Sequence, residues 1–217
     1  FAPAEKLATI FFTLWKYVQL LFVPHPLTHD YYPRAIEKMT FANVAVLASV
    51  ALYVGMAIYA IRGIGKRDPL RFGILFYLLT LSIVSNFVFP IGTNMGERFA
   101  FMPSVGFCIV LVSLLFAFWY KNNNLKLLLG IFGGIILLFS VKTIIRNNAW
   151  ASNEKLFFTD VHVSKNSAKI RNACGGVLFE KASKETNEVR RDELCNQAML
   201  HLDKAIEIYP NYSDAFV

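Results

Sequence analysis

Five long apolar runs dominate this sequence, and each approaches the length of about 20 residues that a helix needs to cross a bilayer. They cover residues 7–23, 39–61, 72–89, 99–119 and 125–145. Of the 217 residues, 55% are hydrophobic and only 17% are charged, which is outside the usual range of soluble proteins. We therefore expect an all-α fold in which residues 1–145 form a polytopic transmembrane domain of about five helices.

Charged residues divide the chain near residue 146. Residues 146–217 are polar and rich in Asn, Ser, Lys and Glu. We expect them to form a helical connector and the first repeat of a tetratricopeptide α-solenoid. In such a repeat, small and large residues at fixed spacing let two antiparallel helices pack closely, and a proline closes the second helix. The residues that fit the second helix are Ala198, Leu202, Ala205 and Pro210.

The first helix of this repeat is predicted from Gly176 and Phe179, which lie three residues apart. Residues 183–192 then form an insertion, about ten residues longer than the usual turn of the repeat. Ala215 and Phe216 resemble the start of a further repeat. Because about three repeats are needed to bury a solenoid core, and because the chain starts without an initiator Met, we expect an internal piece of a longer protein.

The basic residues of the short loops predict the orientation in the membrane, since Lys and Arg in such loops mark the cytoplasmic side. The loops after the second and fourth runs therefore belong on that side, and the repeats on the other. The net charge of +7 has the same origin, and no motif indicates nucleic-acid binding. The basic residues of the two loops are Arg62, Lys66, Arg67, Arg71, Lys121 and Lys126.

A short turn between the third and fourth runs carries Glu97 and Arg98 to the edge of the hydrocarbon. Ionisable residues at that depth are costly and are candidates for function. Arg98 can bind the oxygens of a lipid phosphate in a bidentate, charge-assisted way, and Glu97 can orient it. In the structural alternative, Arg98 reaches the phosphates of bulk lipid with Glu97 as its local partner.

The loop between the first two runs adds His29 and Asp30 on the same side. We expect these two side chains to be hydrogen-bonded to each other or to a ligand. His25 and His29 are four residues apart, but Pro26 disfavours the helix that would align them as metal ligands. We therefore predict no metal site.

The three cysteines give little information. Cys108 lies in an apolar run, and we expect it in the core. Cys174 and Cys195 lie in the polar part, where a disulfide requires an oxidising compartment. Two cysteines alone leave that pairing open.

Five groups of residues together carry a resemblance to a known family. The most specific is Gly-Glu-Arg-Phe at 96–99, followed by Pro-Ser-Val-Gly-Phe-Cys at 103–108. The chain in this respect resembles the C-terminal half of the transmembrane and tetratricopeptide repeat-containing O-mannosyltransferases, which are polytopic GT-C glycosyltransferases. The other groups are residues 21–25 leading to Asp30, residues 89–92, Arg146 and Asn147 with Trp150, Leu156 and Phe157, and the repeat after residues 167–169.

The resemblance implies transfer of a sugar, mannose in eukaryotic members, from a polyprenyl-phosphate-linked donor to a protein hydroxyl on the outer or lumenal face. The donor is a substrate, and no cofactor is assigned. The acidic residue thought to act as general base in this family would precede Phe1, so no catalytic residue is assigned either. Residues 29–33 look more like those of bacterial relatives. The predicted donor-phosphate residues are Arg98, Glu97, His29 and Asp30.

These features predict a multi-pass protein of a bacterial inner membrane or of the endoplasmic reticulum. Its repeats would bind a protein acceptor or a partner subunit. The alternative function is a non-catalytic, membrane-anchored tetratricopeptide scaffold in a larger membrane complex.

Overall fold

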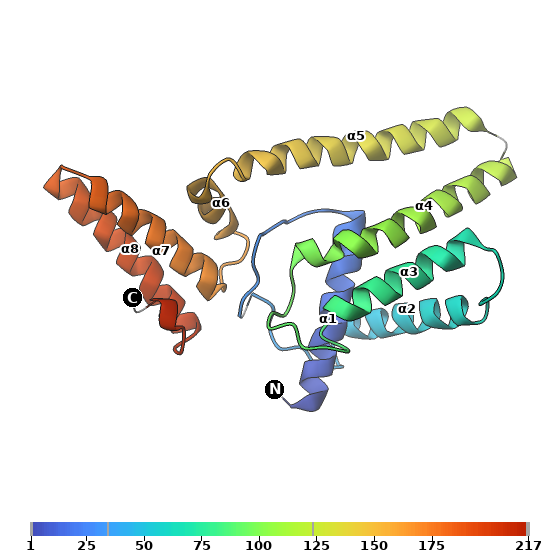
Figure 1. Ribbon diagram of the computed structural model, residues 1–217, viewed down its shortest axis with the longest axis horizontal. Coiled ribbons are helices and arrows are strands. Elements are labelled where there is room, and N and C mark those ends of the chain that lie inside the picture. The colour runs from blue at the N-terminus through green and yellow to red at the C-terminus, as the bar shows by residue number, and fades with distance from the viewer. Residues whose placement is uncertain (1, 34, 123, 216–217) are drawn as a thin grey trace. The chain divides into compact units, whose positions relative to one another are not determined.

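The computed structural model describes residues 2–33, 35–122 and 124–215, and every regular element in these ranges is a helix (Figure 1). The predicted all-α class is therefore confirmed. The elements in chain order are α1 (Pro3–Phe22), α2 (Val44–Ile61), α3 (Pro69–Val84), the 3-10 helix η1 (Glu97–Ala100), α4 (Phe101–Asn122), α5 (Leu125–Ala149), α6 (Asn153–Asp160), α7 (Ala168–Lys184), α8 (Glu188–Ile208) and the 3-10 helix η2 (Ser213–Ala215).

The predicted count of about five crossings is not matched. By length and composition, three helices in the described ranges can cross a membrane, namely Val44–Ile61, Glu97–Lys121 and Leu125–Ala149. The first run does form a helix, but α1 carries charged residues along its length, among them Lys6 and Lys16. The third run yields α3, which has only 16 residues.

The ends of α3 explain why it is shorter than the predicted run. Its N-terminus lies at Pro69, where Asp68 accepts a hydrogen bond from the backbone N–H of Leu70 over 3.0 Å. Its last residue is Val84, and Asn86 has a positive φ of 60° that no α-helix contains. The helix thus starts before the apolar run and ends five residues before residue 89.

The chain divides into two compact units. The first consists of residues 1–25, 38–92 and 96–143, and the second of residues 26–37, 93–95 and 144–217. The second unit thus contains the last turns of α5, the helices α6 to α8 and part of the loop that follows α1.

Buried tyrosines link three helices of the first unit. The hydroxyl of Tyr53 on α2 donates to the carbonyl of Leu14 on α1 over 3.1 Å. The hydroxyl of Tyr77 on α3 lies 2.7 Å from that of Tyr53, and since Tyr53 gives its own proton to Leu14, Tyr77 is the donor. Both rings are at most 9% exposed. Both tyrosine hydroxyls therefore have a partner in this apolar interior.

Two glycines allow α3 and α4 to approach closely. A Cβ atom at Gly106 would lie 2.6 Å from the carbonyl oxygen of Gly73 and 2.7 Å from the backbone nitrogen of Tyr77. A Cβ atom at Gly73 would lie 2.9 Å from the carbonyl oxygen of Gly106. Small residues at such contacts are the usual means of close packing between membrane helices.

In the second unit, α7 and α8 form an antiparallel pair (Figure 1). The glycine that faces α8 is Gly175, one residue before the predicted Gly176. A Cβ atom at Gly175 would lie 2.8 Å from Leu202, whereas one at Gly176 meets nothing within 4 Å. Phe179 is 63% exposed. The prediction that Gly176 and Phe179 form the packing face of the first helix was therefore wrong.

The predicted insertion, residues 183–192, does not form a long loop, because most of its residues belong to α7 or α8. Only residues 185–187 separate α7 from α8, and Asn187 caps α8 by accepting from the N–H of Arg190. One helix pair and η2 are present in the described residues, so a solenoid of repeats stays a prediction. Phe216, which was assigned to a further repeat, lies outside the described residues.

One of the three cysteines does not lie where the sequence predicted. Cys108 is exposed, so its predicted core position was wrong. It lies on a face of α4 that the described part of the chain does not cover. Cys174 and Cys195 are both free thiols, on α7 and α8 respectively.

We predict that Gly106→Ala separates α3 from α4 and destabilises the first unit by about 1–3 kcal/mol, as overpacking does. The atoms that the new methyl group meets are backbone atoms, which cannot rotate away. Thermal unfolding of the protein in detergent measures the effect. Gly134→Ala on α5 is the matched control, because a Cβ atom there meets nothing within 4 Å. Equal melting temperatures for the two variants would contradict the prediction.

Candidate functional site

The turn that carries Glu97 and Arg98 is anchored to α1 by one buried side chain. The hydroxyl of Tyr17 accepts a hydrogen bond from the N–H of Gly96 over 3.1 Å and donates to the carbonyl of the same residue over 3.2 Å. Tyr17 is 1% exposed. Both polar backbone groups of Gly96 are thereby satisfied, and η1 begins at the next residue. A tyrosine 79 positions away in sequence thus fixes the start of the turn.

Arg98 is exposed on this turn. Its guanidinium lies over the ring of Phe99, 5.3 Å from the ring centroid. It makes no ion pair within the described residues, so the alternative in which Glu97 is its local partner is not observed there. The structure therefore presents a cation on an anchored turn directly before the apolar helix α4.

A second cluster of charge lies in the second unit, around Asp160. Arg146 donates from both terminal nitrogens, over 2.6 Å to Oδ1 and 2.8 Å to Oδ2 of Asp160. His29 donates to Oδ2 from its backbone N–H over 2.7 Å and from Nδ1 over 2.8 Å. Asp160 is 0% exposed. The carboxylate thus joins the end of α5, the end of α6 and the loop after α1.

The ionisation of Asp160 follows from these contacts. Burial alone raises the pKa of this carboxyl group, but the hydrogen bonds from Arg146 and His29 favour the charged form and outweigh burial. The net result is a pKa well below the ordinary value of 3.8. Because an ionised carboxylate only accepts, Nδ1 of His29 carries a proton.

Asp30 belongs to the same unit but has different partners. Its Oδ2 accepts from the N–H of Tyr32 over 2.8 Å and from the hydroxyl of Ser167 over 3.0 Å. Ser167 also caps α7 and lies 2.8 Å from the carbonyl of Tyr32, while Lys169 is 3.6 Å from Oδ1 of Asp30. The expected hydrogen bond between His29 and Asp30 is not the one observed, because each side chain binds a different residue of the second unit.

The four predicted donor-binding residues are thus divided between the two units. Glu97 and Arg98 belong to the first, and His29 and Asp30 to the second. In the described part of the chain, no group of three or more His, Cys, Asp or Glu side chains is arranged to hold a metal ion.

Sequence reasoning assigned no site role to three residues that hold these clusters in place, namely Tyr17, Arg146 and Asp160. Tyr17 lies in an apolar run and carries no signal of its partner. Arg146 directly follows the fifth run, and a charge that is removed from water there requires an opposite charge. That rule could have directed attention to Asp160 as the partner.

Comparison with known proteins gives a consistent set of relatives. Protein O-mannosyl-transferase TMTC1 of Homo sapiens is 26% identical over 212 residues, which is 94% of this chain. Protein O-mannosyl-transferase TMTC3 of Mus musculus is 30% identical over 192 residues, or 81% of the chain, and TMTC4 of Homo sapiens is 29% identical over 118 residues, or 54%. The chain is a relative of the TMTC protein O-mannosyl-transferases. The resemblance seen in the sequence is therefore confirmed.

The chain spans only a fifth or so of these relatives, namely 22% of TMTC1, 20% of TMTC3 and 16% of TMTC4. No family model matches the chain, and no solved structure matches it significantly. The animal relatives named here do not test the prediction of a bacterial-type member. Together with the three apolar helices, they support a membrane protein related to glycosyltransferases.

We predict that Asp160→Asn destabilises the second unit by about 3–5 kcal/mol, the usual cost of removing one partner of a buried ion pair. The substitution removes the negative charge that both terminal nitrogens of Arg146 bind, while the Arg146 side chain is only 14% exposed. Chemical unfolding of the protein, followed by a probe on α7, measures the loss. Asp203→Asn is the control, because Asp203 is exposed on α8.

The same pair predicts a pH dependence. A carboxyl group whose pKa is lowered in the folded state contributes stability above its unfolded pKa and loses it as the pH falls toward the folded value. Wild type should therefore lose stability below about pH 4, and Asp160→Asn should lose less over the same range. Parallel curves for the two proteins would exclude this role of Asp160.

Proposed function

We propose that this protein transfers a mannose-like sugar from a polyprenyl-phosphate-linked donor to Ser or Thr hydroxyls of proteins on the non-cytoplasmic face of its membrane. The relatives named above are protein O-mannosyl-transferases, and this favours an enzyme over a scaffold. The donor, the acceptor and the side of the membrane are parts of the proposal.

The exposed guanidinium of Arg98 is the observation that carries the proposal within this chain. It lies at the start of a helix long enough to cross the membrane and has no carboxylate partner in the described residues. A donor anchored by a lipid tail holds its phosphate at the headgroup level, which is also the level of a helix end. Arginine binds phosphate oxygens bidentately with its planar guanidinium.

Transfer of the sugar is favoured by a cation next to the phosphate of the donor. During transfer, the bond from the sugar anomeric carbon to the phosphate oxygen breaks, and a bond to the acceptor hydroxyl oxygen forms. Negative charge gathers on the departing lipid phosphate, and a fixed cation there stabilises the transition state. The hydroxyl proton passes to a base that none of the residues above provides.

Anchoring matters because electrostatic stabilisation is largest when the charge is already in position. Tyr17 holds the residue before η1 from both sides of its peptide, so the turn cannot shift without breaking two buried hydrogen bonds. Glu97, the first residue of η1, is positioned by the same anchor.

His29 and Asp30 remain in the proposal as donor-binding residues. Asp160 accepts a hydrogen bond from Nδ1 of His29, so the other ring nitrogen, Nε2, is the atom left for a phosphate, to which it donates when the ring carries both protons. Asp30 orders the loop through Tyr32 and Ser167, so its part in donor binding is to position His29. The α7–α8 pair is proposed to bind the protein acceptor.

We predict that Arg98→Lys lowers sugar transfer by on the order of 1–3 kcal/mol in transition-state binding, because lysine keeps the charge but loses the planar pair of donors. Arg98→Ala should cost more. The measurement is kcat/KM of the full-length protein with a polyprenyl-phosphate mannose donor and a peptide acceptor. Arg62→Ala is the control, since Arg62 is also an exposed arginine at a helix end.

Unchanged turnover in both Arg98 variants, with the protein still folded in the membrane, would rule out phosphate binding by this residue. Equal losses in the Arg98 and Arg62 variants would point to surface charge in general. A bidentate contact is supported only if Arg98→Ala lowers sugar transfer and Arg98→Lys does not fully restore it.

A further inference from the structure

The loop between α2 and α3 is strongly basic and largely unpaired. Arg62, Lys66 and Arg67 are exposed, and none of them forms an ion pair within the described ranges. The loop has one acidic residue, Asp68, whose Oδ2 lies 3.0 Å from Nε of Arg71 while its Oδ1 caps α3. The loop thus keeps three positive charges without a counter-charge.

Two of these charges line a cleft. A cleft of about 520 Å³ lies between the end of α2 and the start of α3, and Lys66, Arg67 and Arg71 contribute to its walls. The side chain of Arg71 crosses directly over Gly63, where any Cβ atom would collide with it. Arg62 belongs to the same loop but does not line the cleft.

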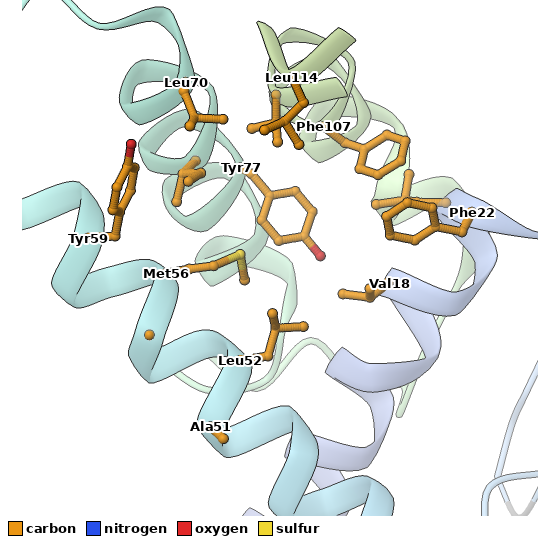
Figure 2. Close-up of a pocket in the computed structure, with 14 residues that line it drawn as sticks. Val18, Phe22, Ala51, Leu52, Met56, Tyr59, Leu70, Tyr77, Phe107 and Leu114 are labelled. Carbon is orange, nitrogen blue, oxygen red and sulfur yellow. The ribbon is translucent and has the colours of Figure 1, made fainter. Parts of the chain in front are cut away.

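An apolar cavity lies among α1, α2, α3 and α4 of the same unit. Its volume is about 560 Å³, which is in the range of ligand-binding pockets. Figure 2 shows Val18, Leu52, Met56 and Tyr77 pointing into it from three helices. A Cβ atom at Gly55, which also lines the cavity, would meet nothing within 4 Å. Because these walls are almost entirely apolar, the cavity is suited to bind a hydrocarbon chain.

The cleft and the cavity meet at one pair of side chains. Tyr59 lines the apolar cavity, and the guanidinium of Arg71, which lines the cleft, lies 4.7 Å from the centroid of the Tyr59 ring. Leu70 lines the cavity next to Arg71 in sequence. A molecule that fills both spaces must therefore join a hydrocarbon chain to an anionic head.

We propose that this combined space is a binding site for an anionic phospholipid of the bilayer, with one acyl chain in the cavity and the phosphate in the cleft. Basic pockets between membrane helices bind such headgroups. A helix of another protein would fit the cavity but would leave the cations of the cleft without a counter-charge. The charge complementarity therefore favours lipid.

This site is separate from the proposed donor site and does not depend on it. It lies at the start of α3, whereas η1 follows the end of that helix. A helix of 16 residues is about 24 Å long, so the two positions are far apart along it. The lipid would hold α1, α2 and α3 together without taking part in sugar transfer.

Native mass spectrometry of the full-length protein in a mild detergent tests the site. The probes are phosphatidylglycerol and phosphatidylcholine with the same acyl chains, added at equal concentration. Wild type should retain phosphatidylglycerol preferentially. The double variant Lys66→Gln, Arg67→Gln should lower that retention by roughly thirtyfold, the effect of about one kcal/mol for each of the two charges. Arg62→Gln should change it little, because Arg62 lies outside the cleft.

A second pair of variants tests the cavity. Gly55→Leu places a side chain in the cavity and should abolish preferential retention, whereas Gly133→Leu on α5, also with open space around it, should not. Equal retention of the two lipids by wild type, or an equal effect of Arg62→Gln and the double variant, would overturn the proposal. So would a wild-type dimer that Gly55→Leu converts to a monomer, because a second copy would then fill the cavity.

Discussion

Buried polar groups are costly without a hydrogen-bond partner, and the described structure depends on the partners that a few of them find. In the first unit, Tyr53 and Tyr77 bind each other and the backbone of α1, and Tyr17 binds both backbone groups of Gly96. In the second, the fully buried Asp160 takes hydrogen bonds from Arg146 and His29. These contacts connect helices that apolar packing alone would leave free to slide.

Much of the fold could be predicted because hydrophobic runs and helix length are local properties of the sequence. All five runs contain a helix. The number of crossings could not be obtained in this way, because α1 combines apolar residues with Lys6 and Lys16, and α3 ends at Val84. The one-residue error between Gly175 and Gly176 has a similar cause, since adjacent glycines look alike until a partner such as Leu202 is placed.

The candidate site could be predicted only in part. Arg98 stood out because a charge between two apolar runs is unusual. Its anchor, Tyr17, lies 79 positions away, and the contact of His29 with Asp160 joins residues 131 positions apart. No periodicity or spacing connects such residues, because the fold alone brings them together. Asp160 shows this limit, since its importance comes entirely from its contacts with Arg146 and His29.

Two arginines at the ends of apolar helices illustrate how structural and functional charges differ. Arg146 lies near the end of α5, and its two terminal nitrogens are both bound to a carboxylate that has no exposure, so little of its charge is left for a ligand. Arg98 lies on the turn before α4 and is exposed, with the Phe99 ring as its neighbour. A largely buried, paired cation stabilises the fold at the cost of desolvation, whereas an exposed cation on an anchored turn keeps its charge for a partner outside the chain. That difference is the reason we propose Arg98 for phosphate recognition and assign Arg146 to the framework.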